Sequence, residues 1–142
     1  SAVDGIEQVH DINSLIAQVD HLVLAAPATP ETHHLINASS LQYAKPGLHL
    51  INIARGSLIQ QDDLITALNS GLLSHATLDV TSPEPLPAGH ALYQHPKVTI
   101  TPHTSATAST VLPAVLEQFK DNLLRYLNGE PLLNQVDVSR GY

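Results

Sequence analysis

The sequence lacks cysteine, methionine and tryptophan, and it carries little positive charge. The absence of cysteine excludes disulfides and thiolate metal sites, and it is compatible with a cytoplasmic protein. Lysine and arginine together number 6, against 13 acidic residues, so the formal net charge is −7. Since no stretch gathers basic residues as a nucleic-acid surface does, we expect no nucleic-acid partner.

Long apolar runs and targeting segments are absent as well. No run approaches the roughly 18 apolar residues of a membrane-spanning helix, and the first residues lack the pattern of a signal peptide. We therefore expect no membrane partner and a cytoplasmic location. The apolar fraction is 43% and the charged fraction 13% over 142 residues, which is typical of a folded domain with a sizeable core. Because the sequence begins at Ser1 and contains no methionine, it is expected to be a piece of a longer protein.

Short apolar runs alternate with helical patterns through most of the sequence. Strands that alternate with helices in this way indicate βαβ units, so the predicted fold class is α/β with a parallel sheet. The strands are expected at 21–26, 48–53, 73–80 and 98–101. Helices are expected at 12–19 with Asp11 as cap, in a turn at Pro30 and Glu31, after Ser39 or Ser40, and at 61–70 before Gly71. A proline-rich loop is expected at 81–91, and a long amphipathic helix at 112–127, in which Pro113 must lie in the first turn or kink the helix.

Polar residues follow the predicted strands at the points where they end. Arg55, Asp79 and His103 come after three different strands, and Glu84 lies in the proline-rich loop. Because the carboxyl ends of parallel strands share one edge of the sheet, these groups can converge there. The fixed donors of an arginine suit a carboxylate, and a histidine oriented by a glutamate can move a proton. No residue can accept a hydride, so an oxidoreductase would need a cofactor.

Each of these residues also has a purely structural interpretation. Arg55 could only pair with a nearby carboxylate, His103 could be a structural histidine before a loop, and Glu84 could be a solvated carboxylate. Asp79 could merely form the turn after its strand. The pair His33 and His34 resembles a metal site, but adjacent residues are expected to point apart, and no metal site is predicted.

Several short motifs together resemble the D-isomer-specific 2-hydroxyacid dehydrogenases, over roughly residues 6–142. The ending, with Gly129-Glu-Pro-Leu, Gln135-Val-Asp and Arg140-Gly-Tyr, is most similar to the glyoxylate/hydroxypyruvate reductase branch. It also suggests that Tyr142 lies at or near the C-terminus of the parent protein. The motifs are 27–32 (PATPET), 45–47 (KPG), 51–56 (INIARG), Asp63-Leu64 with Ala67-Leu68 and Gly71, 78–80 (LDV), 84–87 (EPLP), His95-Pro96 and 101–103 (TPH).

The resemblance implies an NAD- or NADP-dependent reduction of a small 2-keto acid, such as glyoxylate or hydroxypyruvate. It implies that Arg55 binds the carboxylate and keto oxygen of the substrate, that His103 protonates the carbonyl, and that Glu84 pairs with His103. It further implies a homodimer for the full-length protein. The cofactor contacts that it implies are Ala26, Pro27, Ile53, Ala54, Arg55, Asp79, His103, Thr104, Ser105 and Ala106.

The sequence departs from the family in having no G-x-G-x-x-G, the motif that holds a dinucleotide pyrophosphate at a helix N-terminus. The resemblance therefore implies the C-terminal half of a Rossmann-type sheet in residues 1–104. Residues 105–142 would be a long helix and tail that return to the substrate domain. Such a half-sheet should expose an edge and an apolar face, and the chain alone is predicted to be inactive.

Two rival functions remain open at this stage. The same fold serves as an NAD-sensing corepressor or a dimerisation scaffold in some relatives, and these keep the arginine, glutamate and histidine. The chain could also be a structural fragment without a function of its own. Neither the preferred keto acid nor the choice between NAD and NADP follows from the sequence.

Overall fold

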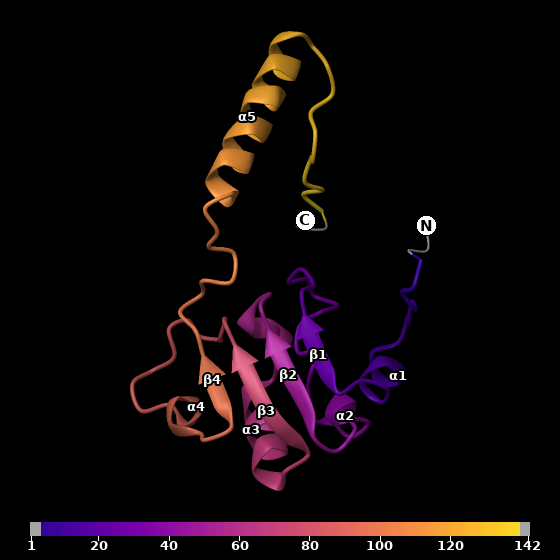
Figure 1. The fold of residues 1–142 in the computed structure, drawn as a ribbon, viewed down its shortest axis with the longest axis vertical. Helices are drawn as coiled ribbons and strands as arrows, with labels where there is room; N and C mark the ends of the chain where they lie inside the picture. The colour runs from indigo at the N-terminus through magenta and orange to yellow at the C-terminus, as the bar shows by residue number, and fades with distance from the viewer. Residues whose placement is uncertain (1–3, 140–142) are drawn as a thin grey trace. The chain divides into compact units, whose positions relative to one another are not determined.

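The computed structural model describes residues 4–139, which form two compact units that divide between His103 and Thr104 (Figure 1). The first unit carries every strand of the described residues, and the second carries the long helix α5, Val111–Leu127. The candidate catalytic residues Arg55, Glu84 and His103 all belong to the first unit.

Four parallel strands form one sheet in the first unit, in the order β1-β2-β3-β4. The predicted α/β class and parallel sheet are therefore confirmed. All strands point toward the same edge, so the segments that follow them gather there (Figure 1). Each strand ends one or two residues before its predicted end. The strands are β1 His21–Leu24, β2 Leu48–Asn52, β3 Leu73–Leu78 and β4 Val98–Ile100.

The helices of the first unit are short except for α3, Gln61–Ser70. Acidic side chains lie in the first turn of α3, and Gly71 ends it in the left-handed conformation with φ 81°, as predicted. Asp11 caps the first helix as predicted, by accepting a 2.8 Å hydrogen bond from the Ser14 backbone. The others are α1 Ile12–Ile16, α2 Ala38–Leu41, the 3₁₀ helix η1 Gly56–Leu58 and α4 Ala91–Gln94.

Four local predictions were wrong. The cap of α2 is Asn37 rather than Ser39 or Ser40, because only Asn37 has an extended backbone and a side-chain oxygen that reaches two helical N–H groups. The first helix ends at Ile16 instead of 19. Residues 30–34 form only turns. The helix α4 was not predicted, because its four residues are too few to show a helical period.

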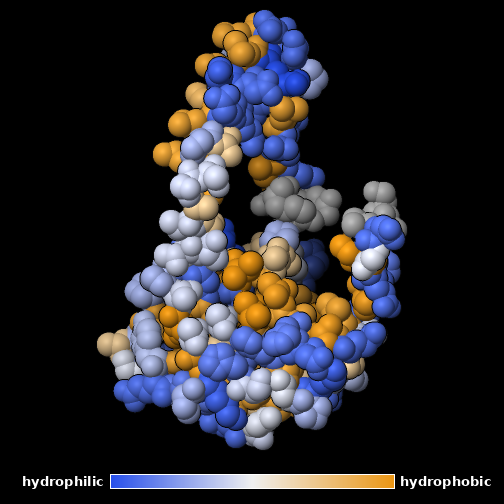
Figure 2. Space-filling view, viewed as in Figure 1, coloured by the Kyte–Doolittle hydropathy of each residue, from blue (hydrophilic) through white to orange (hydrophobic). Residues whose placement is uncertain are grey.

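The two faces of the sheet are covered unequally. Leucines of β1, β2 and β3 alternate inward, so Leu22, Leu50 and Leu78 are buried in one core with the helices of this unit. The other face carries Val23, which is 52% exposed, and a row of three histidines, His21, His49 and His75. Figure 2 shows apolar surface on this unit. The sheet thus has the exposed edge strand that the sequence predicted, whereas its open face, predicted to be apolar, carries histidines beside its apolar residues.

The second unit consists of α5 and a tail that folds back on it. Pro113 lies in the first turn of α5, as expected, and Gly129 has the positive φ of 70° that lets the chain leave the helix. The side chain of Asn122 accepts a 2.8 Å bond from Leu133 N and donates a 3.2 Å bond to its carbonyl, which fastens the tail to the helix. Among residues 4–139, no helix has the length and apolar character that crossing a membrane requires.

Candidate active site

The segment that follows β2 carries Arg55 and is held by the side chain of Asn52. Asn52 is fully buried. Its Oδ1 accepts a 3.0 Å hydrogen bond from Ala54 N, and its Nδ2 donates a 2.9 Å bond to the carbonyl of Arg55. These bonds hold the segment directly after β2, while the N–H of Ile53 still donates a 3.2 Å bond to the carbonyl of Leu24 in β1.

The side chain of Arg55 is free to bind a ligand. Its Nη1 donates a 2.6 Å bond to the carbonyl of Ala54. No carboxylate forms an ion pair with it within the described residues, so the interpretation of Arg55 as half of a strand-end salt bridge is wrong. A guanidinium has five N–H donors in a fixed plane, and most of those of Arg55 remain for a carboxylate or carbonyl oxygen.

Glu84 and His103 form a direct pair, although 19 positions separate them in the sequence. Their atoms Oε1 and Nδ1 lie 2.6 Å apart. The second carboxylate oxygen of Glu84 accepts a 3.2 Å bond from Thr81 N. The His103 hydrogen bond is the main cause that lowers the pKa of Glu84, and the Thr81 bond adds to it, whereas burial and Asp79 act in the opposite direction. Glu84 is therefore an acceptor at neutral pH.

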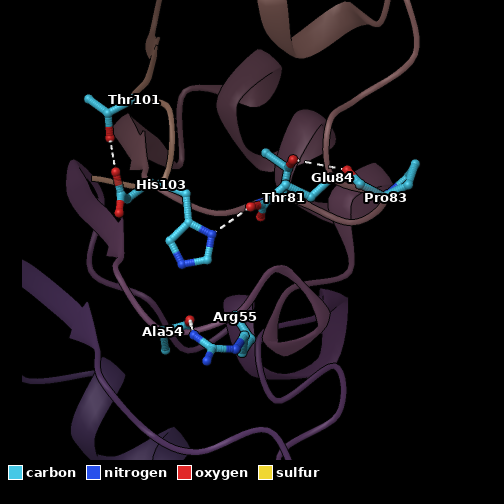
Figure 3. Close-up of polar contacts among 8 residues, drawn as sticks. Ala54, Arg55, Thr81, Pro83, Glu84, Thr101 and His103 are labelled. Carbon is cyan, nitrogen blue, oxygen red and sulfur yellow. Dashed lines mark hydrogen bonds and ion pairs between the residues drawn. The ribbon is translucent and has the colours of Figure 1, made fainter. Parts of the chain in front are cut away.

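Because an ionised carboxylate has no hydrogen to donate, Nδ1 of His103 must carry the proton of this bond. The other ring nitrogen, Nε2, is then the one that can exchange a proton with a substrate. Figure 3 shows the ring edge with Nε2 turned away from Glu84 and toward Arg55. The arrangement is that of a proton donor whose orientation and charge a carboxylate controls.

The backbone of His103 is in a conformation that residues other than glycine seldom adopt. Its φ is 53°, in the left-handed region, and its N–H donates a 3.0 Å bond to the carbonyl of Thr101. Such conformations concentrate at functional sites, where the surrounding structure compensates for the strain. At His103 the side-chain bond to Glu84 is one compensating contact.

Asp79 follows β3 and is nearly buried, with 4% of its surface exposed. Its N–H donates a 2.9 Å bond to the carbonyl of Asn52, and its carboxylate accepts a hydrogen bond from the Thr101 hydroxyl. Asp79 therefore does more than begin the turn after β3, because its two hydrogen bonds also link the ends of β2 and β4. A carboxylate oxygen has more than one lone pair, so it can accept a further bond from a ligand amide.

A cavity of about 640 Å³ lies beside the Glu84–His103 pair. The pair and Asp79 form its polar wall, and the remainder is mainly apolar. Arg55 is not among the residues that line this cavity. The remaining lining residues are Thr81, Pro85, Leu86, Leu92, Tyr93, Val98, Ile100, Thr101 and Pro102.

The predicted cofactor residues of the first unit lie in the segments that follow its four strands, with His103 in the segment after β4. Pro27 is exposed, Ile53 is 43% exposed, and Ala26 is partly buried. The cofactor role of these residues stays a prediction. Thr104, Ser105 and Ala106 are exposed residues of the second unit, and their role stays a prediction.

The histidine pair at 33 and 34 differs from the sequence expectation in its geometry. The two rings lie against each other, with centroids 3.8 Å apart, so the prediction that they point apart was wrong. The reason is the backbone of His34, whose φ of 51° reverses the usual direction of its side chain. In residues 4–139, no three histidine, aspartate or glutamate side chains cluster as a metal ion would require.

Comparison with known proteins places the chain in a family. Residues 1–105 match the model of the NAD-binding domain of D-isomer specific 2-hydroxyacid dehydrogenases. The chain belongs to this family. The residues that match this NAD-binding domain include the whole first unit, and the motif-based expectation that residues 1–104 are the second half of such a domain stays a prediction.

Related proteins of the family agree with this assignment. The glyoxylate/hydroxypyruvate reductase A of Serratia proteamaculans (strain 568) is 39% identical over 143 residues, which covers 99% of this chain and 45% of that protein. The chain spans less than half the length of the first curated relatives, 41% and 45%.

Two solved structures of the family superpose closely on the chain. A D-isomer specific 2-hydroxyacid dehydrogenase from Xanthobacter autotrophicus Py2, in complex with NADPH and MES, has a TM-score of 0.92 at 39% identity and covers 100% of this chain and 59% of its own. An NADPH-dependent glyoxylate/hydroxypyruvate reductase from Sinorhizobium meliloti, in complex with NADP and sulfate, has a TM-score of 0.90 at 29% identity and covers 100% and 46%.

Proposed function

We propose that this chain supplies the substrate-binding arginine and the acid–base pair of an oxidoreductase. The enzyme would reduce a small 2-keto acid, such as glyoxylate or hydroxypyruvate, to the D-2-hydroxy acid with NADH or NADPH. The observation that carries the proposal is the 2.6 Å contact of His103 Nδ1 with Glu84, which leaves Nε2 directed toward Arg55. The names of the related reductases support the substrate class.

Arg55 would bind the substrate by its carboxylate. Two parallel N–H donors of the guanidinium would hold the two carboxylate oxygens, and a further donor would polarise the neighbouring keto oxygen. The bound nicotinamide would supply the hydride to the carbonyl carbon. Asp79 would help to seat the nicotinamide, and the segment 104–106 would extend the contact with the cofactor. The other residues of the first unit that would contact the cofactor are Ala26, Pro27, Ile53, Ala54, Arg55 and His103.

His103 would deliver the proton that balances the hydride. Its Nε2 would donate to the developing alkoxide, so that the imidazolium becomes a neutral imidazole whose Nδ1 still bonds Glu84. The carboxylate of Glu84 stabilises the imidazolium before transfer and keeps the ring in the tautomer that presents Nε2. Both groups act without leaving their observed hydrogen bond.

The proposal is tested by measuring the loss of NADH or NADPH absorbance with glyoxylate and hydroxypyruvate. The 142-residue chain is assayed alone, where we expect no turnover, and fused behind the N-terminal part of the Serratia proteamaculans reductase, where we expect activity. In the fusion, His103→Asn should lower kcat by roughly 10²–10⁴-fold, the usual contribution of a general acid. The matched control His10→Asn alters an exposed histidine and should leave kcat unchanged.

Turnover by the isolated chain would refute its predicted inactivity. A folded fusion that binds NADH, seen as a change in nicotinamide fluorescence, but never reduces a keto acid would support the rival function of a cofactor-binding scaffold.

In the same proposal, residues 105–142 belong to the substrate domain, and the full-length protein is a homodimer. Light scattering of the full-length protein tests the dimer.

A further inference from the structure

Gln61, the first residue of α3, makes two hydrogen bonds to one residue of the proline-rich loop. Its Nε2 donates to the carbonyl of Ser82 at 2.6 Å, and its Oε1 accepts from the N–H of Ser82 at 3.0 Å. Both polar backbone groups of Ser82 are therefore satisfied by one amide. Only asparagine and glutamine offer a donor and an acceptor side by side in this way, so the residue type matters as well as its position.

Ser82 is separated from Glu84 by a single residue, Pro83, whose ring fixes its φ. Thr81, on the other side, donates its N–H to Glu84 Oε2 and its hydroxyl to the carbonyl of Pro83 at 2.9 Å. The loop thus has little freedom between the residue that Gln61 holds and the carboxylate that meets His103. Glu84 itself is exposed, with 40% of its side-chain surface open to solvent. Fixing the backbone on both sides compensates for the weak burial of this side chain.

We propose that Gln61 is a positioning residue that holds the loop 81–84, so that Glu84 stays in contact with His103. Gln61 touches neither His103 nor Glu84, and it acts through Ser82 alone. The importance of the contact for turnover rests on the function proposed above, whereas the contact itself is measurable without turnover. Gln61 belongs to none of the sequence motifs from which the site was predicted.

The carboxyl of Glu84 reports the contact. His103 and the Thr81 N–H lower its pKa, and Asp79, the other charged group that acts on it, raises it. A loop released by loss of Gln61 moves Glu84 away from His103 and Thr81 N, so the carboxyl should titrate closer to the ordinary glutamate value of 4.5. A substitution that only loosens α3 would leave this titration where it is.

The experiment is a pH titration of the 142-residue chain with ¹³C-labelled glutamate, followed by NMR. The variants are Gln61→Ala and Gln61→Leu, the second of which keeps most of the side-chain volume without the amide. The control is Gln60→Ala, which removes the neighbouring glutamine, whose side chain makes no capping bond to the helix. We expect both Gln61 variants to raise the midpoint of Glu84 and Gln60→Ala to leave it at the wild-type value.

The outcomes separate the two proposals. If wild-type Glu84 titrates below 4.5 and neither Gln61 variant moves it, the positioning role is wrong while the Glu84–His103 pair stands. An equal movement in Gln60→Ala would also overturn the positioning role. If wild-type Glu84 titrates as an ordinary glutamate, the pair is not formed, and both the positioning role and the proposed acid–base function fail.

Discussion

Gly56 is the residue at which a single added methyl group should do most damage to the site. A Cβ on Gly56 would lie 2.0 Å from both the carbonyl carbon and oxygen of Thr81 and 2.6 Å from Ser82 N. All three are backbone atoms, which cannot rotate away as the end of a side chain can. Gly56→Ala must therefore push the loop after β2, which carries Arg55, away from the loop that carries Glu84.

The expected cost follows from this geometry. Adding a methylene to a packed site costs about 1–3 kcal/mol, and three backbone contacts place Gly56→Ala at the upper end, about 3 kcal/mol. For a unit of about 100 residues, each kcal/mol lowers Tm by about 4–8 °C, so a loss of about 12–24 °C is expected. The control is Gly47→Ala, where nothing lies within 4 Å but φ is +90°, so only the left-handed penalty of about 1–2 kcal/mol applies.

The assay is urea unfolding, followed by the NMR signals of the first unit for the wild type and both variants. We expect Gly56→Ala to lose clearly more free energy of unfolding than Gly47→Ala, and the Glu84 titration to move only in Gly56→Ala. A loss in Gly56→Ala equal to or smaller than that in Gly47→Ala would refute the close contact of the two loops.

Three further predictions concern single residues of the first unit. Asn52→Leu leaves the N–H of Ala54 and the carbonyl of Arg55 without their partner, at about 1–3 kcal/mol for each group, measurable by urea unfolding. Asn37→Ala removes the capping box of α2 and should cost about 1 kcal/mol in the same assay, with Gln42→Ala as the control. Burial, and then the neighbouring histidines, lower the pKa of His49 in the folded protein below the ordinary value of 6.5. The stability that neutral His49 contributes is therefore fully present above pH 6.5 and is lost as the pH falls through the pKa of the folded state. His49→Gln should flatten this part of the stability–pH curve, and an unchanged slope would contradict the shift.

The course of the chain could be predicted from the sequence wherever a pattern repeats. The strands and α3 show a clear period, and each was found within two residues of its place. The cap of α2 was assigned wrongly because Asn37, Ser39 and Ser40 are all residues that favour caps, and only the backbone conformation distinguishes them. The helix α4 has four residues, about one turn, which is too short to show a helical period.

The pair of Glu84 and His103 was predicted from the family motifs rather than from spacing, since residues 19 apart in loops have no fixed relation. Asn52, by contrast, was visible as a polar interruption of an apolar strand. A buried asparagine needs partners for its amide, and that requirement could have identified it as the residue that shapes the Arg55 loop. Gln61 and Thr81 had no such signal, because their bonds join two loops that only the folded sheet brings together.

These contacts form a continuous connection from the end of β2 to the end of β4. Asn52 binds the Arg55 carbonyl and the Asp79 N–H, Gln61 binds Ser82, and Glu84 binds His103. Since almost every step involves backbone atoms of a loop, the separation of Arg55 from His103 is set by backbone geometry rather than by the rotamers of exposed side chains. The reaction proposed above, in which Arg55 would hold a carboxylate and His103 would protonate the adjacent carbonyl, would need a fixed separation of this kind. Each substitution along this connection should therefore alter the pH titration of Glu84. Substitutions on the open face of the sheet should leave that titration unchanged.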